Sequence, residues 1–161
     1  NKNIIGAAQS TTELTGKKVA VIPSRSVPQG IAALMKLVPF GDFDDVVAEM
    51  QSSLQEVQTG EVTQATRSVE IDDVPTQKGE YIALLNGKLV FSSPNFLDTC
   101  FGLLTKANAG QYELLTFFSG QDLSTQEAAV LASMIQEKYP NLEIDKQVGN
   151  QPHYHVIMSI E

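Results

Sequence analysis

A chain of 161 residues, 42% of them hydrophobic, has the size of one compact domain or of two small lobes and is too apolar to be disordered. Its formal net charge of -8 argues against nucleic acid or an anionic membrane as the main partner and suits a partner protein with a basic face. The single cysteine excludes an internal disulfide. With no signal peptide and no apolar run of about 20 residues, these features predict a cytoplasmic protein without membrane insertion.

The first third of the chain predicts the order helix, strand, loop and helix, which is the order of a βαβ crossover. A short helix is expected over residues 3–14. Residues 18–23 read Lys-Val-Ala-Val-Ile-Pro, an apolar run with three β-branched residues, which predicts a strand buried on both faces of a parallel sheet. Since the chain opens without Met and no strand precedes the first helix, we expect a piece of a longer protein.

A polar loop follows the predicted strand and contains Ser24, Arg25, Ser26 and Gln29, ahead of a helical pattern over residues 31–37. In open α/β sheets, ligands and partners gather where strands end and helices begin. The loop can bind a carboxylate or phosphate at the start of the helix. Alternatively, its hydroxyl groups cap the helix and its arginine lies on the surface; both interpretations stay open.

The next helix has Asp42 or Asp44 as its N-cap and is expected to run to Gly60, which supplies the stop. Residues 61–71 then alternate polar and apolar side chains, as in an antiparallel strand with one wet face. We expect residues 72–79 to form a polar turn.

The clearest local signal is Asn86-Gly87 between two apolar strands, which predicts a hairpin with a type I′ turn. Next we predict a helix whose buried stripe includes Phe96, Leu97, Cys100, Leu103 and Leu104. A buried strand is expected over 112–118, followed by a helix with the capping box Ser124–Glu127. The last two elements predicted are strands over 142–148 and 153–160.

These elements predict an α/β fold with a mixed sheet, which has a parallel, Rossmann-like part and an antiparallel part, and with helices packed on the sheet. We expect one domain over residues 1–161, which can divide into a parallel α/β lobe over 1–59 and a mixed α+β lobe over 60–161.

The chemistry-bearing side chains do not assemble a catalytic set. His153 and His155 would share one face of a strand, but with no neighbouring carboxylate or thiol a solvent face or a sheet edge is preferred over a metal site. Cys100 lies in a helical apolar stripe, where cysteine behaves as a small hydrophobe. The sequence contains no phosphate-binding loop and no nucleophile elbow. We therefore predict no catalytic residues and no metal ligands.

Several stretches, taken in order, resemble the C-terminal part of the bacterial dihydroxyacetone-kinase-like proteins, the ATP-binding subunit of fatty acid kinase. They are Asn1-Lys2-Asn3-Ile4-Ile5, Val21-Ile22-Pro23-Ser24-Arg25-Ser26-Val27-Pro28-Gln29-Gly30, Thr59-Gly60-Glu61-Val62-Thr63-Gln64-Ala65-Thr66-Arg67, Gly87-Lys88-Leu89-Val90, Tyr139-Pro140 and Gly149-Asn150-Gln151-Pro152-His153-Tyr154.

The resemblance implies a DegV-like domain, similar to acyl-binding proteins, within a multidomain kinase. In such a parent an N-terminal domain, absent from this sequence, holds Mg-ATP. This domain would carry no cofactor and no phosphotransfer chemistry. It would dock the separate acyl-carrying, fatty-acid-binding subunit; a homodimer of the parent stays open.

The sequence departs from the family pattern at Ser24 and Ser26, where threonines are common, and at Asn150, which replaces a frequent glycine but tolerates a left-handed backbone. Candidate residues for binding a ligand or partner are Ser24, Arg25, Ser26, Gln29 and Gln151.

The leading hypothesis is therefore a non-catalytic docking domain of a fatty acid kinase subunit. The alternative is a small-molecule domain that binds a fatty acid, phosphate or carboxylate through the loop 24–30. A hydrolase or phosphatase acting alone is the least favoured hypothesis.

Overall fold

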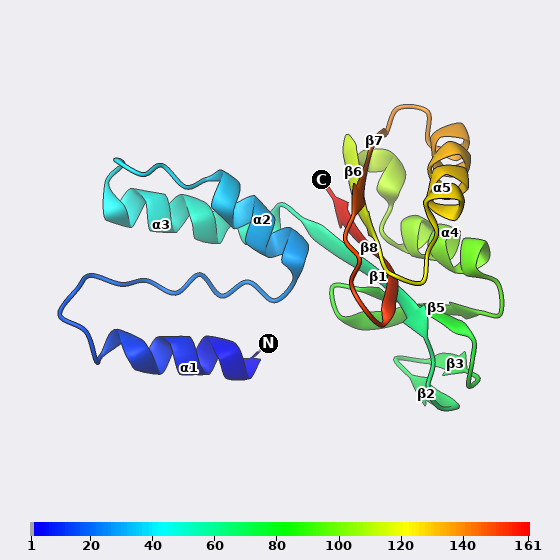
Figure 1. Cartoon of the computed structure of the whole chain (residues 1–161), viewed down its shortest axis with the longest axis horizontal. Coiled ribbons are helices and arrows are strands. Elements are labelled where there is room, and N and C mark those ends of the chain that lie inside the picture. The colour runs from blue at the N-terminus through cyan, green and yellow to red at the C-terminus, as the bar shows by residue number, and fades with distance from the viewer. Residues whose placement is uncertain (1) are drawn as a thin grey trace. The chain divides into compact units, whose positions relative to one another are not determined.

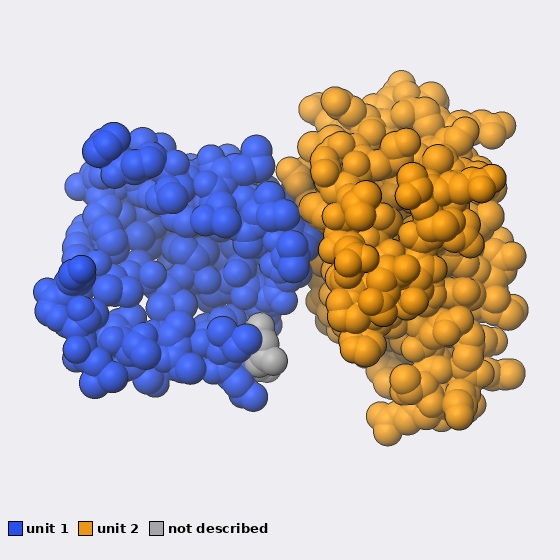
Figure 2. All heavy atoms as spheres, in the orientation of Figure 1, with its two compact units in different colours: residues 1–57 blue, residues 58–161 orange. Residues whose placement is uncertain are grey.

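The computed structural model describes residues 2–161 (Figure 1). Its helices are α1 (Lys2–Thr12), α2 (Val27–Met35), α3 (Phe43–Ser52), the 3-10 helix η1 (Ser53–Gln55), α4 (Phe96–Lys106), the 3-10 helix η2 (Ala109–Gln111) and α5 (Thr125–Lys138). Its strands are β1 (Gln58–Gln64), β2 (Val69–Ile71), β3 (Val74–Thr76), β4 (Tyr81–Leu85), β5 (Lys88–Ser93), β6 (Leu114–Ser119), β7 (Glu143–Val148) and β8 (Tyr154–Ile160). The chain forms two compact units, residues 1–57 and 58–161 (Figure 2).

Over its described residues, 2–57, the first unit contains helices joined by irregular segments, and no strand. Helix α2 begins after the N-cap Ser26 with Pro28 in its first turn, where the fixed φ of proline suits a helix start. Helix α3 begins after Asp42, whose carboxylate accepts hydrogen bonds from the backbone N–H groups of Asp44 (2.9 Å) and Asp45 (3.2 Å). The N-cap predicted at Asp42 is therefore confirmed.

The strand predicted over residues 18–23 is wrong. This segment has no regular structure, and no strand occurs among residues 2–57 to pair with it. Its apolar side chains are not buried on both faces, since Val19 is 47% exposed. An apolar, β-branched run favours an extended backbone, but a strand exists only where a neighbouring strand supplies its hydrogen bonds.

The second unit is built on a six-stranded mixed sheet of order β5-β4-β1-β8-β6-β7. Strands β6 and β7 pair in parallel, joined by a crossover through α5, whereas the other neighbouring strands pair antiparallel. The predicted α/β class with a mixed sheet is confirmed. The parallel part was expected in residues 1–59, and this is wrong, because the parallel pair is β6 and β7 in this unit and no strand lies in residues 2–57. None of the helices in residues 2–161 is long and apolar enough to cross a bilayer.

Two boundaries around β1 differ from expectation. Gly60 was predicted to stop a helix, but it lies inside β1. A Cβ at this position would come 2.7 Å from Cδ2 of Leu103 on α4. Glycine therefore allows α4 to approach β1 closely. The strand predicted over 61–71 is two strands, β1 and β2. The polar turn predicted over 72–79 contains β3, and β2 and β3 form a hairpin through Asp72 and Asp73, both at positive φ.

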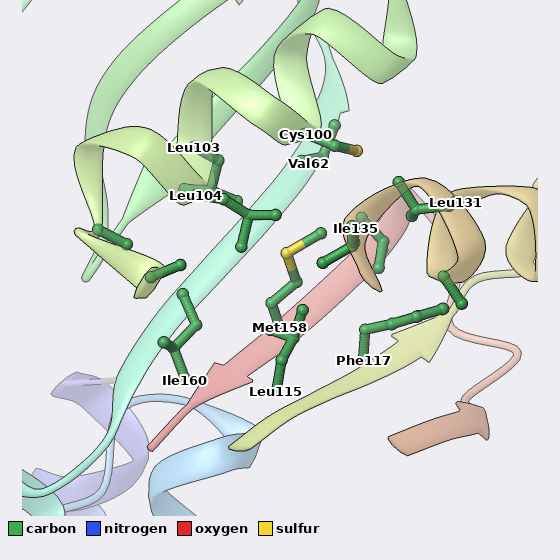
Figure 3. Close-up of a cluster of buried hydrophobic side chains, with 14 of the residues drawn as sticks. Val62, Cys100, Leu103, Leu104, Leu115, Phe117, Leu131, Ile135, Met158 and Ile160 are labelled. Carbon is green, nitrogen blue, oxygen red and sulfur yellow. The ribbon is translucent and has the colours of Figure 1, made fainter. Parts of the chain in front are cut away.

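Helices α4 and α5 cover one face of this sheet (Figure 1), and the core lies between these helices and the sheet. Figure 3 shows side chains of the two helices and of strands β1, β6 and β8 pointing toward one another. The largest fully buried side chains include Leu103, Leu131, Phe117, Met158 and Ile160. Close-packed aliphatic and aromatic groups therefore fill the space between sheet and helices.

Local signals in this unit behave as expected. Asn86 and Gly87 have φ angles of 52° and 79° and join β4 to β5 in the predicted hairpin. Ser124 and Glu127 form the predicted capping box at the start of α5. Strands β7 and β8 begin one residue later than predicted.

Candidate functional site

The candidate residues between 24 and 29 join the loop to the start of α2. The Ser26 hydroxyl accepts a hydrogen bond from the backbone N–H of Gln29 (3.3 Å) and caps the helix. The Gln29 side chain accepts from the backbone N–H of Arg25 (2.9 Å) and donates to the carbonyl oxygen of Leu54 in η1 (3.1 Å). Ser26 and Gln29 thus stabilise the loop, as the capping interpretation expects.

Arg25 and Ser24 have different surroundings in the same loop. Arg25 is exposed, whereas Ser24 is half-buried beside Gly30 at the start of α2. An exposed guanidinium close to a helix N-terminus can attract an anion. Binding of a carboxylate or phosphate by this loop stays a prediction.

Gln151, the remaining candidate, belongs to the second unit and fixes the turn between β7 and β8. Its side-chain amide donates to the carbonyl oxygens of Phe118 (2.8 Å) and Tyr154 (3.4 Å), and its backbone carbonyl accepts from the N–H of Gln121 (3.1 Å). Asn150 takes φ 52°, the left-handed backbone expected of an asparagine at this position. These bonds give Gln151 a role in the fold.

The two histidines do not form a shared site. His153 lies in the turn before β8 with φ 71°, so the alternation of a strand does not apply to the pair. His155 lies in β8, a central strand rather than a sheet edge, and packs against the rings of Tyr81 and Phe96 at 5.2 and 5.9 Å. Among residues 2–161, no group of three His, Cys, Asp or Glu side chains could hold a metal ion.

Cys100 is fully buried in the core, as predicted. Burial raises the pKa of its thiol, so the reactive thiolate is disfavoured.

Glu61 of β1 places a carboxylate among apolar neighbours on a face of the sheet. It pairs with Leu84 and Ile157 on the neighbouring strands and lies on the face opposite the helices, because the adjacent Val62 points into the core. Burial raises the pKa of Glu61. Burial also raises the pKa of Tyr154, and the negative charge of Glu61 adds to that shift. The face therefore carries an acid whose ionised form is poorly hydrated.

We expect Glu61→Gln to raise the melting temperature at pH 7 and to have little effect near pH 4. A raised pKa in the folded state means that the folded chain binds this proton more readily than the unfolded chain. This preference stabilises the folded chain at a pH below the pKa of Glu61 in the unfolded chain, and the stabilisation is lost as the pH rises through the pKa of Glu61 in the folded chain. Glutamine does not ionise, so the variant avoids that loss. Thermal unfolding at the two pH values measures the difference. Glu143→Gln, at an exposed position of β7, is the control and should change the melting temperature at pH 7 less than Glu61→Gln does.

The second unit also contains a groove that the sequence analysis missed. Its volume is about 440 Å³, and it lies where the starts of α4 and α5 meet Tyr81 of β4. The sequence interpretation assigned Phe96 and Leu97 to the buried stripe of α4, but both are half-buried and line this groove. The sequence does contain the two residues that cap these helix starts, Asn95 and Ser124. It does not show that the two helix starts meet in space, so the groove could not be predicted from them.

The fold of this chain is that of the DegV family. A DegV-family protein from Ruminococcus gnavus, solved with vaccenic acid, superposes with a TM-score of 0.63 at 13% identity, over 98% of this chain and 65% of that one. A DegV-family protein from Thermus thermophilus, described by its fatty acid binding, gives 0.58 at 12% identity over 96% and 65%. The class is thus an α/β domain of DegV-like fold.

A family model for the C-terminal domain of FakA-like fatty acid kinase proteins matches residues 1–161, and the chain belongs to this family. Protein YloV of Bacillus subtilis is 35% identical over all 161 residues, and the uncharacterized protein SH1689 of Staphylococcus haemolyticus is 34% identical. The chain spans 29% of the length of each relative. The resemblance seen in the sequence is confirmed.

Proposed function

We propose that this domain docks the acyl-carrying subunit of a fatty acid kinase, so that a domain elsewhere in the parent protein can phosphorylate the bound fatty acid with Mg-ATP. Family membership supports a fatty-acid-related role. The DegV-family neighbours, which are described by their fatty acids, agree with it. On this proposal the chain supplies a protein contact in the cytoplasm and takes no part in phosphotransfer.

The observation that carries the proposal is the apolar surface of the first unit. Eleven of the fifteen exposed large hydrophobic side chains of the described residues lie in residues 1–57. Three of them, Ile31, Leu34 and Met35, are neighbours at helical spacing on α2, and contiguous exposed apolar surface usually marks a contact with another protein surface. This distribution therefore favours a docking role for residues in this part of the chain.

Helix α2 shows this surface most clearly. It buries Pro28 and Ala33, but Leu34 and Met35 are 63% and 79% exposed. Ile31, three residues before Leu34, is exposed on the same face, so the helix is apolar there as well as on the side that buries Pro28 and Ala33. A helix that is hydrophobic all round is normally covered all round.

A small-molecule domain is the second candidate, because two DegV-family neighbours are described with fatty acids. In this chain the space between sheet and helices is filled by the core. An acyl chain would therefore have to bind elsewhere, and the loop 24–30 is the place predicted for its carboxylate. Native mass spectrometry that detects a co-purified fatty acid would support this candidate over docking alone.

Calorimetric titration of the fatty-acid-loaded acyl-carrying subunit into the 161-residue chain should show saturable binding with a Kd of about 1 μM or tighter. Met35→Ser should weaken it about tenfold, because the substitution removes an exposed apolar contact. Val148→Ser is the matched control, since Val148 is 80% exposed but lies on the edge strand β7.

Arg25→Ala tests the predicted loop in the same titration. Arg25 is a cleaner probe than Gln29, because Gln29 also holds the loop to η1. Absence of binding by a folded wild-type chain would contradict the proposed function. Equal effects of Met35→Ser and Val148→Ser would contradict the place given to the contact.

A further inference from the structure

The groove between the starts of α4 and α5 has apolar walls and one charged side chain. Tyr81, Phe96, Leu97 and Val130 supply the walls, and Glu127 is the charged residue among those that line it. A groove of about 440 Å³ is large enough for a long side chain and too open to be a packing defect of the core. We refer to it as the α4–α5 groove.

The carboxylate of Glu127 is held in place by the capping box, which also favours its ionised form. Its Oε2 accepts hydrogen bonds from the backbone N–H of Ser124 (2.9 Å) and from the Ser124 hydroxyl (2.6 Å). These two bonds lower the pKa of Glu127. Both bonds go to Oε2, so neither of them occupies Oε1.

The charge distribution favours a cation over an anion in this groove. Two helix N-termini lie at its rim and by themselves would attract an anion. Each is already capped, however: Asn95 accepts from the N–H of Asp98 (3.1 Å) and Ser124 accepts from the N–H of Glu127 (3.2 Å). Asp98 and Glu127 also place a negative charge in each first turn.

The walls suit a cation that is carried on a hydrophobic stem. The rings of Tyr81 and Phe96 meet edge to face at 5.5 Å, and the ring of His155 contacts both, at 5.2 and 5.9 Å. Aromatic faces attract a guanidinium or ammonium group, and apolar walls accept the methylene stem of arginine or lysine. The net charge of -8 gives the whole chain the same preference for a basic surface.

We propose that the α4–α5 groove accepts an arginine or lysine side chain of the docking partner, with its cation on Oε1 of Glu127 and its stem against Phe96, Leu97 and Val130. The identity of the partner as the acyl-carrying subunit rests on the proposed function. The preference of the groove for a basic side chain does not rest on the proposed function.

The first test uses a peptide probe and the full 161-residue chain at pH 8. The peptide acetyl-Leu-Arg-Leu-amide is titrated into ¹⁵N-labelled chain, with the citrulline peptide as its uncharged isostere. We expect amide shifts at Phe96, Glu127 and Val130 and an affinity about fivefold or more higher for the arginine peptide. Equal affinities, or shifts elsewhere only, would overturn the proposal.

Two variants test the groove itself. Glu127→Gln removes the charge but keeps a capping-box residue, so α5 should still form; it should abolish the preference for arginine. Val130→Trp fills the groove from a position that is half-exposed and should weaken both peptides. Glu137→Gln, near the other end of α5 and exposed, is the matched control and should change neither.

The same variants are then titrated with the acyl-carrying subunit. Weaker binding to Glu127→Gln than to Glu137→Gln supports the groove as a docking contact. Equal binding by these two variants overturns the groove as that contact and leaves the proposed function standing. A wild-type chain that discriminates the peptides but does not bind the subunit overturns the proposed function and not the chemistry of the groove.

Discussion

Phe117→Ala is expected to lower the free energy of unfolding of the second unit by about 3–5 kcal/mol. Phe117 is fully buried at the middle of β6 and points into the core between the sheet and α5 (Figure 3). Truncation removes most of an aromatic side chain and leaves a cavity that the surrounding leucines can fill only in part. Because domains are typically stable by only about 5–15 kcal/mol, this single change should remove a large part of the total.

Tyrosine emission gives a clean measurement of this loss. The chain has no tryptophan, and its four tyrosines all lie in residues 58–161, so urea unfolding followed by tyrosine fluorescence reports the second unit alone. Phe118→Ala is the control, because Phe118 is only half-buried and points to the opposite face of the sheet. Equal losses for the two variants would mean that the face assigned to the core is wrong.

Gly120→Ala is the second substitution with a large expected effect, a loss of at least about 3 kcal/mol. A Cβ at this position would overlap the carbonyl oxygen of Tyr154 and lie 3.0 Å from that of Gln151. Both are backbone atoms, which cannot rotate away as a side chain can. The hydrogen bond from the N–H of Gly120 to the carbonyl oxygen of His155 (2.9 Å) would also be disturbed.

The corresponding control is Gly110→Ala in η2. There a Cβ would meet the ring of Tyr139 at 3.6 Å, an ordinary van der Waals contact. We expect its free energy of unfolding in urea to stay within about 0.5 kcal/mol of the wild type. If Gly120→Ala were equally neutral, the close approach of β8 to the end of β6 would have to be wrong.

The parts of the fold that the sequence predicted correctly depend on chemistry within a few residues. The Asn86-Gly87 turn, the Asp42 N-cap and the capping box of Ser124 and Glu127 are each determined by neighbours three or fewer positions away. Cys100 was placed correctly because helical spacing assigns it to a buried stripe. Such signals are readable from one chain alone.

The errors concern contacts between distant residues. Residues 18–23 have the composition of a buried strand, but a strand needs a partner that composition cannot supply. Gly60 looked like a helix stop because sequence does not show that Leu103, 43 positions later, packs against it. The hairpin of β2 and β3 was predicted as a turn because its strands are short and polar.

For the candidate site, too, local features were predicted and contacts between distant residues were missed. The loop around Ser26 and Gln29 was found from its position between an apolar run and a helix, and its internal bonds are local. The α4–α5 groove was not found, since it needs Tyr81, Phe96 and Val130 from three elements to converge. Its wall residues appear in the sequence only as ordinary core hydrophobes.

The position of β8 in the sheet has a consequence for synthesis of the protein on the ribosome. Residues 154–160 lie between β1 and β6, so β1, formed by residues 58–64, gains this neighbour only after almost a hundred further residues are made. At about 5–20 residues per second, that interval is several seconds. During it the apolar faces of β1, α4 and β6 have no completed sheet to cover them. The nascent chain therefore exposes apolar surface during this interval, and we expect a stall or a premature stop before residue 154 to yield aggregation-prone protein.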